Sequence, residues 1–449
     1  MMWTDPTLAE WAARTDGQLI GEDKVIAGLS TDSRSTQAGD IYLAIRGESF
    51  DGHQYIQQAI AAGAIAVVAE QPQTIDDSIS QLIVPDSKRA LGYLAGLLRD
   101  RFQGQVIALT GSVGKTSTRA MLENILSRQA NLLATQGNFN NDIGVPKTWF
   151  RLTDQHQQAL IEMGANHQQE IAWLCEFSKP NIGLLLNAGQ AHTEGFGGLA
   201  GVRQAKGEII DGTLDSGCCV LNRDDPAFEQ WQLRAGAKKV ITFGRDAQAD
   251  VQLLRYQLAP LGSEFCLATP SGEVTIAWSM IGEHMALNAA AATATALAAG
   301  VTLNDICSGL QSMAAEPGRL EPVVSNFDGP LINDAYNANP ESFKAAIDVL
   351  SAMSGQPILV AGDMAELGDD IIAMHQQVGQ YAKEKAITVL SVGRYAQYIS
   401  DSADGSCFGS IEQLIAALPE QLNSQTAVLI KGSRSAGMER VVDALRRSN

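Results

Sequence analysis

The chain carries, at residues 106–117, the stretch VIALTGSVGKTS. An apolar run breaks here into a glycine-rich loop, which delivers Lys115 and then Thr116. A buried strand that leads through such a loop into a helix points backbone N–H groups, and the positive end of the helix, at phosphate oxygens. The lysine adds a positive charge for the outer phosphates, and the hydroxyl is placed to bind a magnesium ion. The stretch predicts a nucleoside triphosphate site in an α/β domain.

The spacing within this loop is short. Two residues separate Gly111 from Gly114, whereas the common phosphate-binding loop has four residues between its glycines. We therefore expect a shortened variant of that loop. A glycine-rich turn ahead of a surface lysine is the alternative, but the apolar strand before the loop and the helical pattern after it favour phosphate binding.

The length of the chain predicts several domains. It has 449 residues, of which 45% are apolar and 18% charged. Because domains commonly have about 100 to 200 residues, we expect three α/β domains, at residues 1–85, 86–315 and 316–449. Pro317 and Gly318 break the helical pattern before them and support the second boundary. The absence of a long polar tract argues against disorder.

Apolar runs that alternate with helical patterns predict mostly parallel sheets covered on both faces by helices. In the first domain, the expected strands begin at Ile41, Ile65 and Gln81. In the central domain, strands are expected at residues 159–163, 182–186 and 218–221, with antiparallel strands within 251–281. In the last domain, they are expected to begin at Leu331, Ile358, Val389 and Ala427.

Charge and termini limit the classes of partner. The formal charge of −18 opposes binding to nucleic acids and to anionic membranes. The six cysteines include no C-x-x-C pair, which favours free thiols. The N-terminus shows no secretory signal, and the Ala-rich run at 285–301 fits a buried helix better than a membrane span. We expect a cytoplasmic protein and a monomer, with no nucleic acid or membrane partner.

Polar residues follow two of the expected central strands. Glu162 lies in an apolar strand near its carboxyl end, where a carboxylate is costly unless it is paired or bound to metal. Magnesium at the nucleotide phosphates is the partner we expect, and a salt bridge is the alternative. His192 follows the next strand and is a second candidate ligand, although a lone histidine is more often structural. From the residues alone, we interpret Lys206 as a helix residue facing solvent.

Three further segments are rich in polar side chains. GNFNNDIGVP, at 137–146, fits either a loop that binds a polar ligand or an Asn-rich structural turn. PGRLE at 317–321 and NDAYNANP at 333–340 place polar residues near the domain junction. KGSRS, at 431–435, follows a strand and is a possible second anion site. Together with the triphosphate loop, these segments suggest an enzyme that closes its domains around several substrates.

These motifs resemble the Mur ligases of peptidoglycan synthesis along the whole chain. The shortened TGSVGKTS loop is that family's form. The segments GNFNNDIGVP, IEMGANHQQEIAWL, AHTEGFGGLAGVRQAKGEI, NDAYNANPESF, VAGDMAELG and KGSRSAGMERVV are similar to those of the members that join D-alanyl-D-alanine to UDP-N-acetylmuramoyl-tripeptide. The sister ligase that adds the third residue usually carries an Asp-Asn-Pro-Arg segment, which this chain lacks.

The resemblance implies an ATP-dependent amide-forming ligase that works through an acyl phosphate and serves cell-wall synthesis, cell shape and cell division. It also implies a UDP-substrate domain at 1–85, a P-loop ATPase domain at 86–315 and a Rossmann-like domain at 316–449. The implied ATP contacts are Thr110, Gly111, Ser112, Val113, Gly114, Lys115, Thr116, His284, Asn288, Arg319, Asp334, Tyr336 and Asn337.

The resemblance further implies a metal centre with two magnesium ions. Its ligands would be Thr116, Glu162, His192 and a carbamylated Lys206, and the last three would act in catalysis together with Lys115. A carbamate would turn the lysine cation into an anionic magnesium ligand.

The same resemblance implies three substrate regions. Ser33, Arg34 and Gly47 are similar to the uridine nucleotide site. The muramyl peptide would meet Thr135, Gln136, Asn138, Asn140 and Asn141. The dipeptide would meet Lys431, Ser433 and Arg434.

Two other functions remain open. Folylpolyglutamate synthase shares the ATPase core but should lack the N-terminal uridine nucleotide domain. A non-enzymatic P-loop switch would hydrolyse ATP slowly without a small acceptor.

Overall fold

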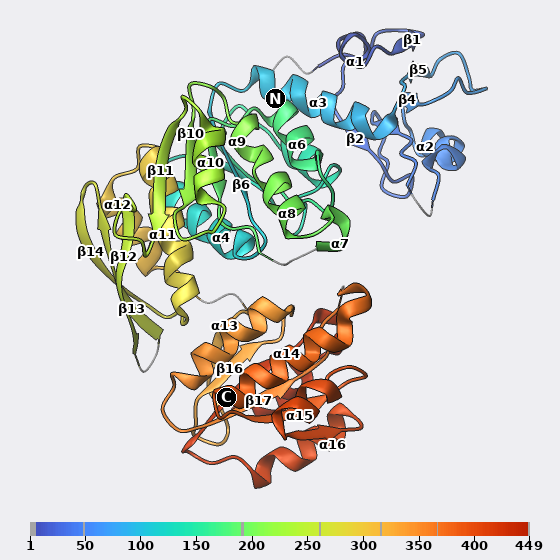
Figure 1. Cartoon of the computed structure of the whole chain (residues 1–449). Helices are drawn as coiled ribbons and strands as arrows, with labels where there is room; N and C mark the ends of the chain where they lie inside the picture. The colour runs from blue at the N-terminus through green and yellow to red at the C-terminus, as the bar shows by residue number, and fades with distance from the viewer. Residues whose placement is uncertain are drawn as a thin grey trace.

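The structure is a computed structural model that describes residues 6–47, 50–189, 193–259, 262–314, 317–365 and 367–447. It contains three sheets in chain order, each with its own helices (Figure 1). Most neighbouring strands are parallel, so the predicted mixed α/β class is confirmed. The domain limits at residues 85 and 315 stay a prediction.

The first sheet has five strands, in the order β1-β5-β4-β3-β2, and only β1 runs antiparallel to its neighbour among the described pairs. The capping box between Thr7 and Glu10 begins α1. The elements are α1 (Leu8–Thr15), β1 (Gln18–Ile20), β2 (Leu29–Ser30), β3 (Ile41–Leu43), η1 (Gly52–Tyr55), α2 (Ile56–Ala61), β4 (Ala66–Ala69) and β5 (Ser80–Ile83).

The helix α3 (Ser87–Arg101) joins the first sheet to the central one (Figure 1). Its residues Leu91 and Leu94 pack in the core of the first sheet, whereas Ala95 packs in a core of the central sheet. The indole of Trp11 in α1 donates a hydrogen bond of 2.7 Å to the Ala90 carbonyl. The helix is therefore shared by both units.

The central sheet has nine strands, in the order β14-β13-β12-β11-β10-β9-β6-β8-β7. It is parallel from β7 to β12, and β12, β13 and β14 are antiparallel, as the alternating pattern predicted. Its strands are β6 (Gln105–Thr110), β7 (Leu132–Ala134), β8 (Gln158–Glu162), β9 (Ile182–Leu185), β10 (Cys218–Asn222), β11 (Lys239–Gly244), β12 (Val251–Ala259), β13 (Gly262–Thr269) and β14 (Gly272–Trp278).

Helices cover both faces of the central sheet, and each face has its own apolar core. They are α4 (Lys115–Leu126), α5 (Gly144–Trp149), α6 (Glu170–Ser178), α7 (Thr193–Phe196), α8 (Leu199–Lys206), α9 (Glu208–Gly212), α10 (Phe228–Ala235), α11 (Glu283–Ala298) and α12 (Leu303–Gln311). The Ala-rich α11 packs in the same core as α4 and α12, as a buried helix should. In the described part of the chain, no helix is long and apolar enough to cross a membrane.

The third sheet has six strands, in the order β15-β16-β20-β17-β18-β19, with β15 antiparallel and the rest parallel. Its strands are β15 (Glu321–Val323), β16 (Leu331–Asp334), β17 (Gln356–Ala361), β18 (Thr388–Val392), β19 (Ser406–Phe408) and β20 (Thr426–Lys431). Its helices are α13 (Pro340–Ser351), η2 (Gly368–Asp370), α14 (Ile371–Glu384), α15 (Gln397–Ala403), α16 (Ile411–Ala417), η3 (Leu418–Glu420), η4 (Arg434–Ala436) and α17 (Glu439–Leu445).

Candidate active site

The predicted phosphate loop joins β6 to α4. Gly114 has a φ of +84°, in the left-handed region that favours glycine. A Cβ at this position would also lie 2.6 Å from the Oδ1 of Asn288, on α11. The loop therefore needs glycine both for its backbone turn and for the close approach of α11.

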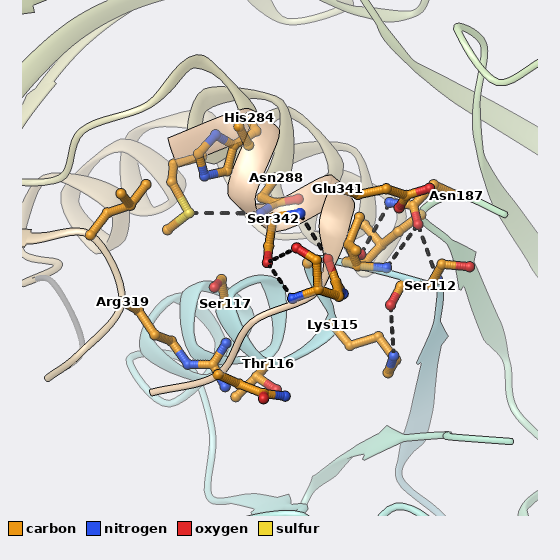
Figure 2. Close-up of a pocket in the computed structure, with 18 of the residues that line it drawn as sticks. Ser112, Lys115, Thr116, Ser117, Asn187, His284, Asn288, Arg319, Glu341 and Ser342 are labelled. Atoms are coloured by element: carbon orange, nitrogen blue, oxygen red, sulfur yellow. Dashed lines mark hydrogen bonds between the residues drawn. The ribbon is translucent and has the colours of Figure 1, made fainter. Parts of the chain in front are cut away.

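The loop opens onto a cavity of about 420 Å³ that lies between the central unit and the third unit (Figure 2). Of the predicted ATP residues, those that line it are Ser112, Val113, Gly114, Lys115, Thr116, His284, Asn288, Arg319, Asp334, Tyr336 and Asn337. Thr110 and Gly111 do not belong to this lining among the described residues. The buried Thr110 hydroxyl instead donates a hydrogen bond of 2.7 Å to the Met163 carbonyl.

Lys115 begins α4 and folds back over its own loop. Its Nζ donates a hydrogen bond of 2.6 Å to the Gly111 carbonyl. Burial lowers the pKa of Lys115, Glu162 opposes this shift, and Arg319 adds to it. Phosphate oxygens in the cavity would favour the charged lysine, so the side chain is placed to bind them.

The far side of the cavity is formed by α11 and by the start of the third unit. Burial lowers the pKa of His284 to about 4, with Lys431 adding to the shift and Asp348 opposing it. The guanidinium carbon of Arg319 lies 4.4 Å from the centre of the Tyr336 ring, and that of Arg434 lies 5.7 Å from it. A neutral imidazole and an aromatic ring at the cavity wall suit a planar heteroaromatic base.

Lys431 lines this cavity as well, although the resemblance assigned it to the dipeptide. Its Nζ lies 2.6 Å from the Oδ2 of Asp334 and also donates to the Asn337 carbonyl at 3.0 Å. The other Asp334 oxygen accepts the Leu320 N–H at 3.0 Å. Burial raises the pKa of Asp334, and Lys431 opposes that shift.

Glu162 ends β8, and its side chain is only 2% exposed. Its Oε1 accepts a hydrogen bond of 2.9 Å from Asn140, and its Oε2 lies 3.5 Å from the Nη1 of Arg119. Oε2 has no hydrogen-bond donor among the described residues. A buried carboxylate oxygen without a donor fits a metal ligand, although the salt-bridge alternative also has its partner in Arg119.

The other predicted ligands of the metal centre are Thr116, His192 and Lys206. His192 lies outside the described residues. Within the described ranges, no group of three or more His, Cys, Asp or Glu side chains is arranged to hold a metal. The Thr116 hydroxyl and a carbamate would be further oxygen donors, and such donors suit magnesium.

Lys206 is buried, with 2% of its surface exposed, so its interpretation as a solvent-facing residue is wrong. It ends the short α8, whose Val202, Ala205 and Lys206 share the inward face. Burial lowers the pKa of Lys206 to about 7; Lys115 adds to the shift, and Glu170 and Glu208 oppose it. A partly neutral, buried amine is a nucleophile at neutral pH.

The Asn-rich loop contacts Glu162 on one side and supports its own turn on the other. Thr135 accepts the Glu162 N–H at 3.0 Å, and the Asn140 carbonyl accepts the Gly164 N–H at 2.8 Å. Asn141 accepts the Gly144 N–H at 2.9 Å at the start of α5, as the structural-turn alternative predicts. Gln136 and Asn138 are exposed. The loop thus leaves side chains available for a ligand beside Glu162.

The predicted uridine nucleotide residues lie in the first unit. The Ser33 hydroxyl donates to Gln58 at 3.1 Å. Arg34 is exposed and pairs with Asp32 at 2.6 Å, which lowers the pKa of Asp32 to about 2. The Gly47 N–H donates to the Phe50 carbonyl at 2.9 Å.

A second cavity, of about 690 Å³, lies at the carboxyl ends of β17, β18 and β19. Arg394 and Ser435 line it, and the sequence interpretation missed Arg394. The Asp363 carboxylate accepts the backbone N–H groups of Arg394 and Ala396 and so shapes this edge. Ser433 is buried beside Ser435, with 3.1 Å between their hydroxyl oxygens.

Two residues of the main cavity were also missed. Asn187 follows β9 and forms hydrogen bonds with the phosphate loop (Figure 2). Glu341, in the first turn of α13, approaches the segment after β9, since a Cβ at Gly189 would lie 2.5 Å from its Oε1. The sequence does contain a sign of each residue. Asn187 is the polar residue that directly follows the apolar run 182–186, and Glu341 is the acidic residue that directly follows NDAYNANP.

Comparisons with known proteins find matches to all three parts of the chain. The descriptions "Mur ligase family, catalytic domain", "Mur ligase middle domain" and "Mur ligase, glutamate ligase domain" match residues 25–95, 109–296 and 318–434. The UDP-N-acetylmuramoyl-tripeptide--D-alanyl-D-alanine ligase of Escherichia coli (strain K12) is 43% identical over 444 residues, which cover 98% of both chains.

Solved structures agree with these matches. A crystal structure of MurF from Acinetobacter baumannii has a TM-score of 0.89 and 35% identity, and covers 98% of this chain and 99% of that one. MurF ligase from Thermotoga maritima in complex with ADP has a TM-score of 0.85 and 27% identity over 93% of this chain and 96% of that one. The chain belongs to the Mur ligase family.

Proposed function

We propose that this chain joins D-alanyl-D-alanine to UDP-N-acetylmuramoyl-tripeptide at the expense of ATP. The tripeptide carboxylate attacks the γ-phosphorus of ATP, which releases ADP and forms an acyl phosphate. The dipeptide amine then attacks the acyl carbon, loses a proton, and phosphate leaves as the amide bond forms. The similarity to the E. coli ligase over 98% of both chains carries this proposal.

The main cavity is the proposed ATP site. Backbone N–H groups at the start of α4 and the Lys115 ammonium would bind the phosphates, while His284 and Asn288 would lie at the adenine. Arg319 and the Asp334–Lys431 pair come from the third unit, so nucleotide binding would draw on both units. The T. maritima relative is in complex with ADP, which supports nucleotide binding by this chain.

Thr116, Glu162, His192 and a carbamylated Lys206 are the proposed magnesium ligands. When bound, magnesium offsets the repulsion between the tripeptide carboxylate and the triphosphate. The Glu162 oxygen that lacks a donor among the described residues supports this assignment. Asn140 would fix the other oxygen of the same carboxylate.

The carbamate of Lys206 has a simple chemical route. A neutral lysine amine adds to carbon dioxide and releases one proton, which gives an anionic carbamate. Burial favours the neutral amine, because it lowers the pKa of Lys206 to about 7. The product would supply an anionic oxygen ligand in a place where the chain encodes a lysine.

The other substrates would bind on either side of the ATP site. Ser33, Arg34 and Gly47 are proposed for the uridine nucleotide, and the loop from Thr135 to Asn141 for the muramyl peptide. The second cavity lies next to the KGSRS motif, and the exposed Arg394 could bind the dipeptide carboxylate there. This cavity is therefore the proposed dipeptide site, with Ser433 and Arg434 beside it.

We further propose that the enzyme works as a monomer in the cytoplasm, where ATP is available. The net charge of −18 supports weak affinity for anionic membranes and nucleic acids. The match of the family's catalytic domain to residues 25–95 favours a Mur ligase over folylpolyglutamate synthase, which is one of the two alternative functions.

Mass spectrometry of the reaction product tests the proposal. The protein is incubated with ATP, magnesium, UDP-N-acetylmuramoyl-tripeptide and D-alanyl-D-alanine. We expect a UDP-linked pentapeptide, together with one ADP and one phosphate per amide bond. ADP formed without a new amide would favour a nucleotide switch instead.

A further inference from the structure

Asn187 lies beside the phosphate loop because of the order of the central strands. β9 is a parallel neighbour of β6, with Leu185 opposite Thr110. The Leu186 N–H continues this pairing by donating to the Thr110 carbonyl at 3.0 Å. The next residue along, Asn187, therefore reaches the loop at the point where β6 ends.

Both the oxygen and the nitrogen of the Asn187 carboxamide form hydrogen bonds with the phosphate loop. Its Oδ1 accepts the N–H groups of Ser112 and Val113, each at 3.0 Å. Its Nδ2 donates to the Val113 carbonyl at 3.1 Å. The side chain thus pairs with Val113 through one donor and one acceptor, as a neighbouring strand would.

A second contact strengthens this arrangement. The Ser112 hydroxyl accepts the Gly189 N–H at 3.0 Å, and the Asn187 carbonyl lies 3.1 Å from the Ser112 nitrogen. The segment 187–189 and the first half of the loop are therefore joined through side chains and backbone. The second half of the loop, from Gly114 to Thr116, is the part that begins α4.

These contacts explain how a loop with two fewer residues keeps its shape. In a phosphate-binding loop, consecutive backbone N–H groups converge on the anion, and they repel one another when no acceptor is present. Here the N–H groups of Ser112 and Val113 already have an acceptor in Asn187. The conformational cost of ordering the loop is then met during folding and not during nucleotide binding.

We propose that Asn187 is a positioning residue that holds the shortened phosphate loop in its binding conformation before the nucleotide arrives. This inference rests on the proposed ATP role of the cavity. It assigns the phosphates to the N–H groups at the start of α4 and to Lys115, and not to those of Ser112 and Val113. Asn187 would act through the loop and would not touch the reacting atoms.

The chain offers a matched control in Asn181. Its Oδ1 accepts the Val106 N–H at 2.8 Å, so it also binds the backbone of β6, but near the other end of the strand. Asn181→Ala therefore removes a carboxamide-to-backbone hydrogen bond near the start of β6, whereas Asn187→Ala removes three such bonds in the loop that follows β6. Only Asn187→Ala should affect the phosphate loop.

The experiment compares the full-length wild type with both variants. Calorimetric titration with ADP and magnesium gives the nucleotide Kd, and hydrogen exchange without nucleotide gives the protection of the Ser112 and Val113 amides. For Asn187→Ala, we expect an ADP Kd about tenfold higher and exchange at the Val113 amide about tenfold faster. The Ser112 amide should change less, because the carbonyl of residue 187 still accepts its N–H. For Asn181→Ala, both quantities should equal those of the wild type, even if its melting temperature falls.

Asn187→Asp covers the case in which Asn187→Ala does not fold. It keeps an acceptor for the two N–H groups but loses the donor and adds a negative charge next to the phosphates. We expect the amides to stay protected while ADP binds more weakly. Loss of that protection in Asn187→Asp would contradict the acceptor role.

The possible failures can be told apart. If the wild type does not bind ADP, the proposed function fails. If the wild type binds ADP and Asn187→Ala binds it with the same Kd and the same exchange, the positioning role is overturned while the proposed function stands. An equal weakening of ADP binding in Asn181→Ala would also overturn it, because the effect would then follow general stability.

Discussion

The ammonium of Lys431, at the end of β20, lies 2.6 Å from the carboxylate of Asp334, at the end of β16. The two strands are parallel neighbours, and these two residues are paired in their register. Both residues are buried, and Lys431 also holds the Asn337 carbonyl. The pair therefore fixes the edge of the third unit that faces the nucleotide cavity.

Lys431→Met should destabilise the third unit by about 3–5 kcal/mol, because it leaves the Asp334 charge buried without its partner. Adding Asp334→Asn should recover part of that loss. All six tryptophans lie before residue 279, so hydrogen exchange in β16 and β20 is a better probe than tryptophan fluorescence. If the double variant loses the sum of the two single losses, the pair is not coupled.

Lys115→Ala should lower kcat/KM for ligation by at least roughly a thousandfold, since the phosphates lose their mobile cation. Phosphate release measures this effect. The melting temperature should stay near that of the wild type, because the lost hydrogen bond is to the loop itself. Lys383→Ala removes an exposed pair with Asp404 and serves as a control with unchanged kinetics. Normal turnover in Lys115→Ala would exclude the proposed role.

Lys206→Ala should also abolish ligation while the fold is retained. A short carboxylic acid such as formate should restore part of the activity, because it can occupy the space of the carbamate and supply the same oxygen donors. Initial rates with and without formate measure the rescue. Full activity of Lys206→Ala without added acid would show that no carbamate is needed.

His284 should make the folded state less stable in acid. Burial lowers its pKa to about 4, compared with an ordinary value of about 6.5. Between these values the unfolded chain binds a proton that the folded chain does not, so stability falls as the pH decreases from about 6.5 to about 4. His284→Gln should lose less stability over this range in urea unfolding at several pH values. Identical pH slopes for both proteins would rule out a buried, neutral His284.

The sequence predicted the elements that have long apolar runs. The strand before the phosphate loop, the strand that ends at Glu162 and the buried Ala-rich helix were all visible, because burial of backbone and side chains requires such runs. The short strands β1, β2, β7, β15 and β19 were missed, since two or three residues are too few to show a period. The three-residue β3 was predicted because it lies in a longer apolar run, whereas the six-residue β11 was missed.

Parts of the site could not be predicted because they depend on tertiary packing. The eight-residue α8 does not show from its sequence which face is covered, so the burial of Lys206 was missed. The resemblance assigned Lys431 to the dipeptide, and the contact of Lys431 with Asp334, 97 residues away in the chain, could not be predicted from the local KGSRS motif. Asn187 was overlooked because its role depends on β9 lying next to β6.

The dependence of phosphate release on the two acceptor substrates tests the central claim most directly. Release is measured with ATP and magnesium, first with neither substrate, then with UDP-N-acetylmuramoyl-tripeptide or D-alanyl-D-alanine alone, and then with both. We predict sustained release only when both are present, at one phosphate per amide bond. Sustained release without the dipeptide, or no release with the complete pair, would contradict the proposed ligase.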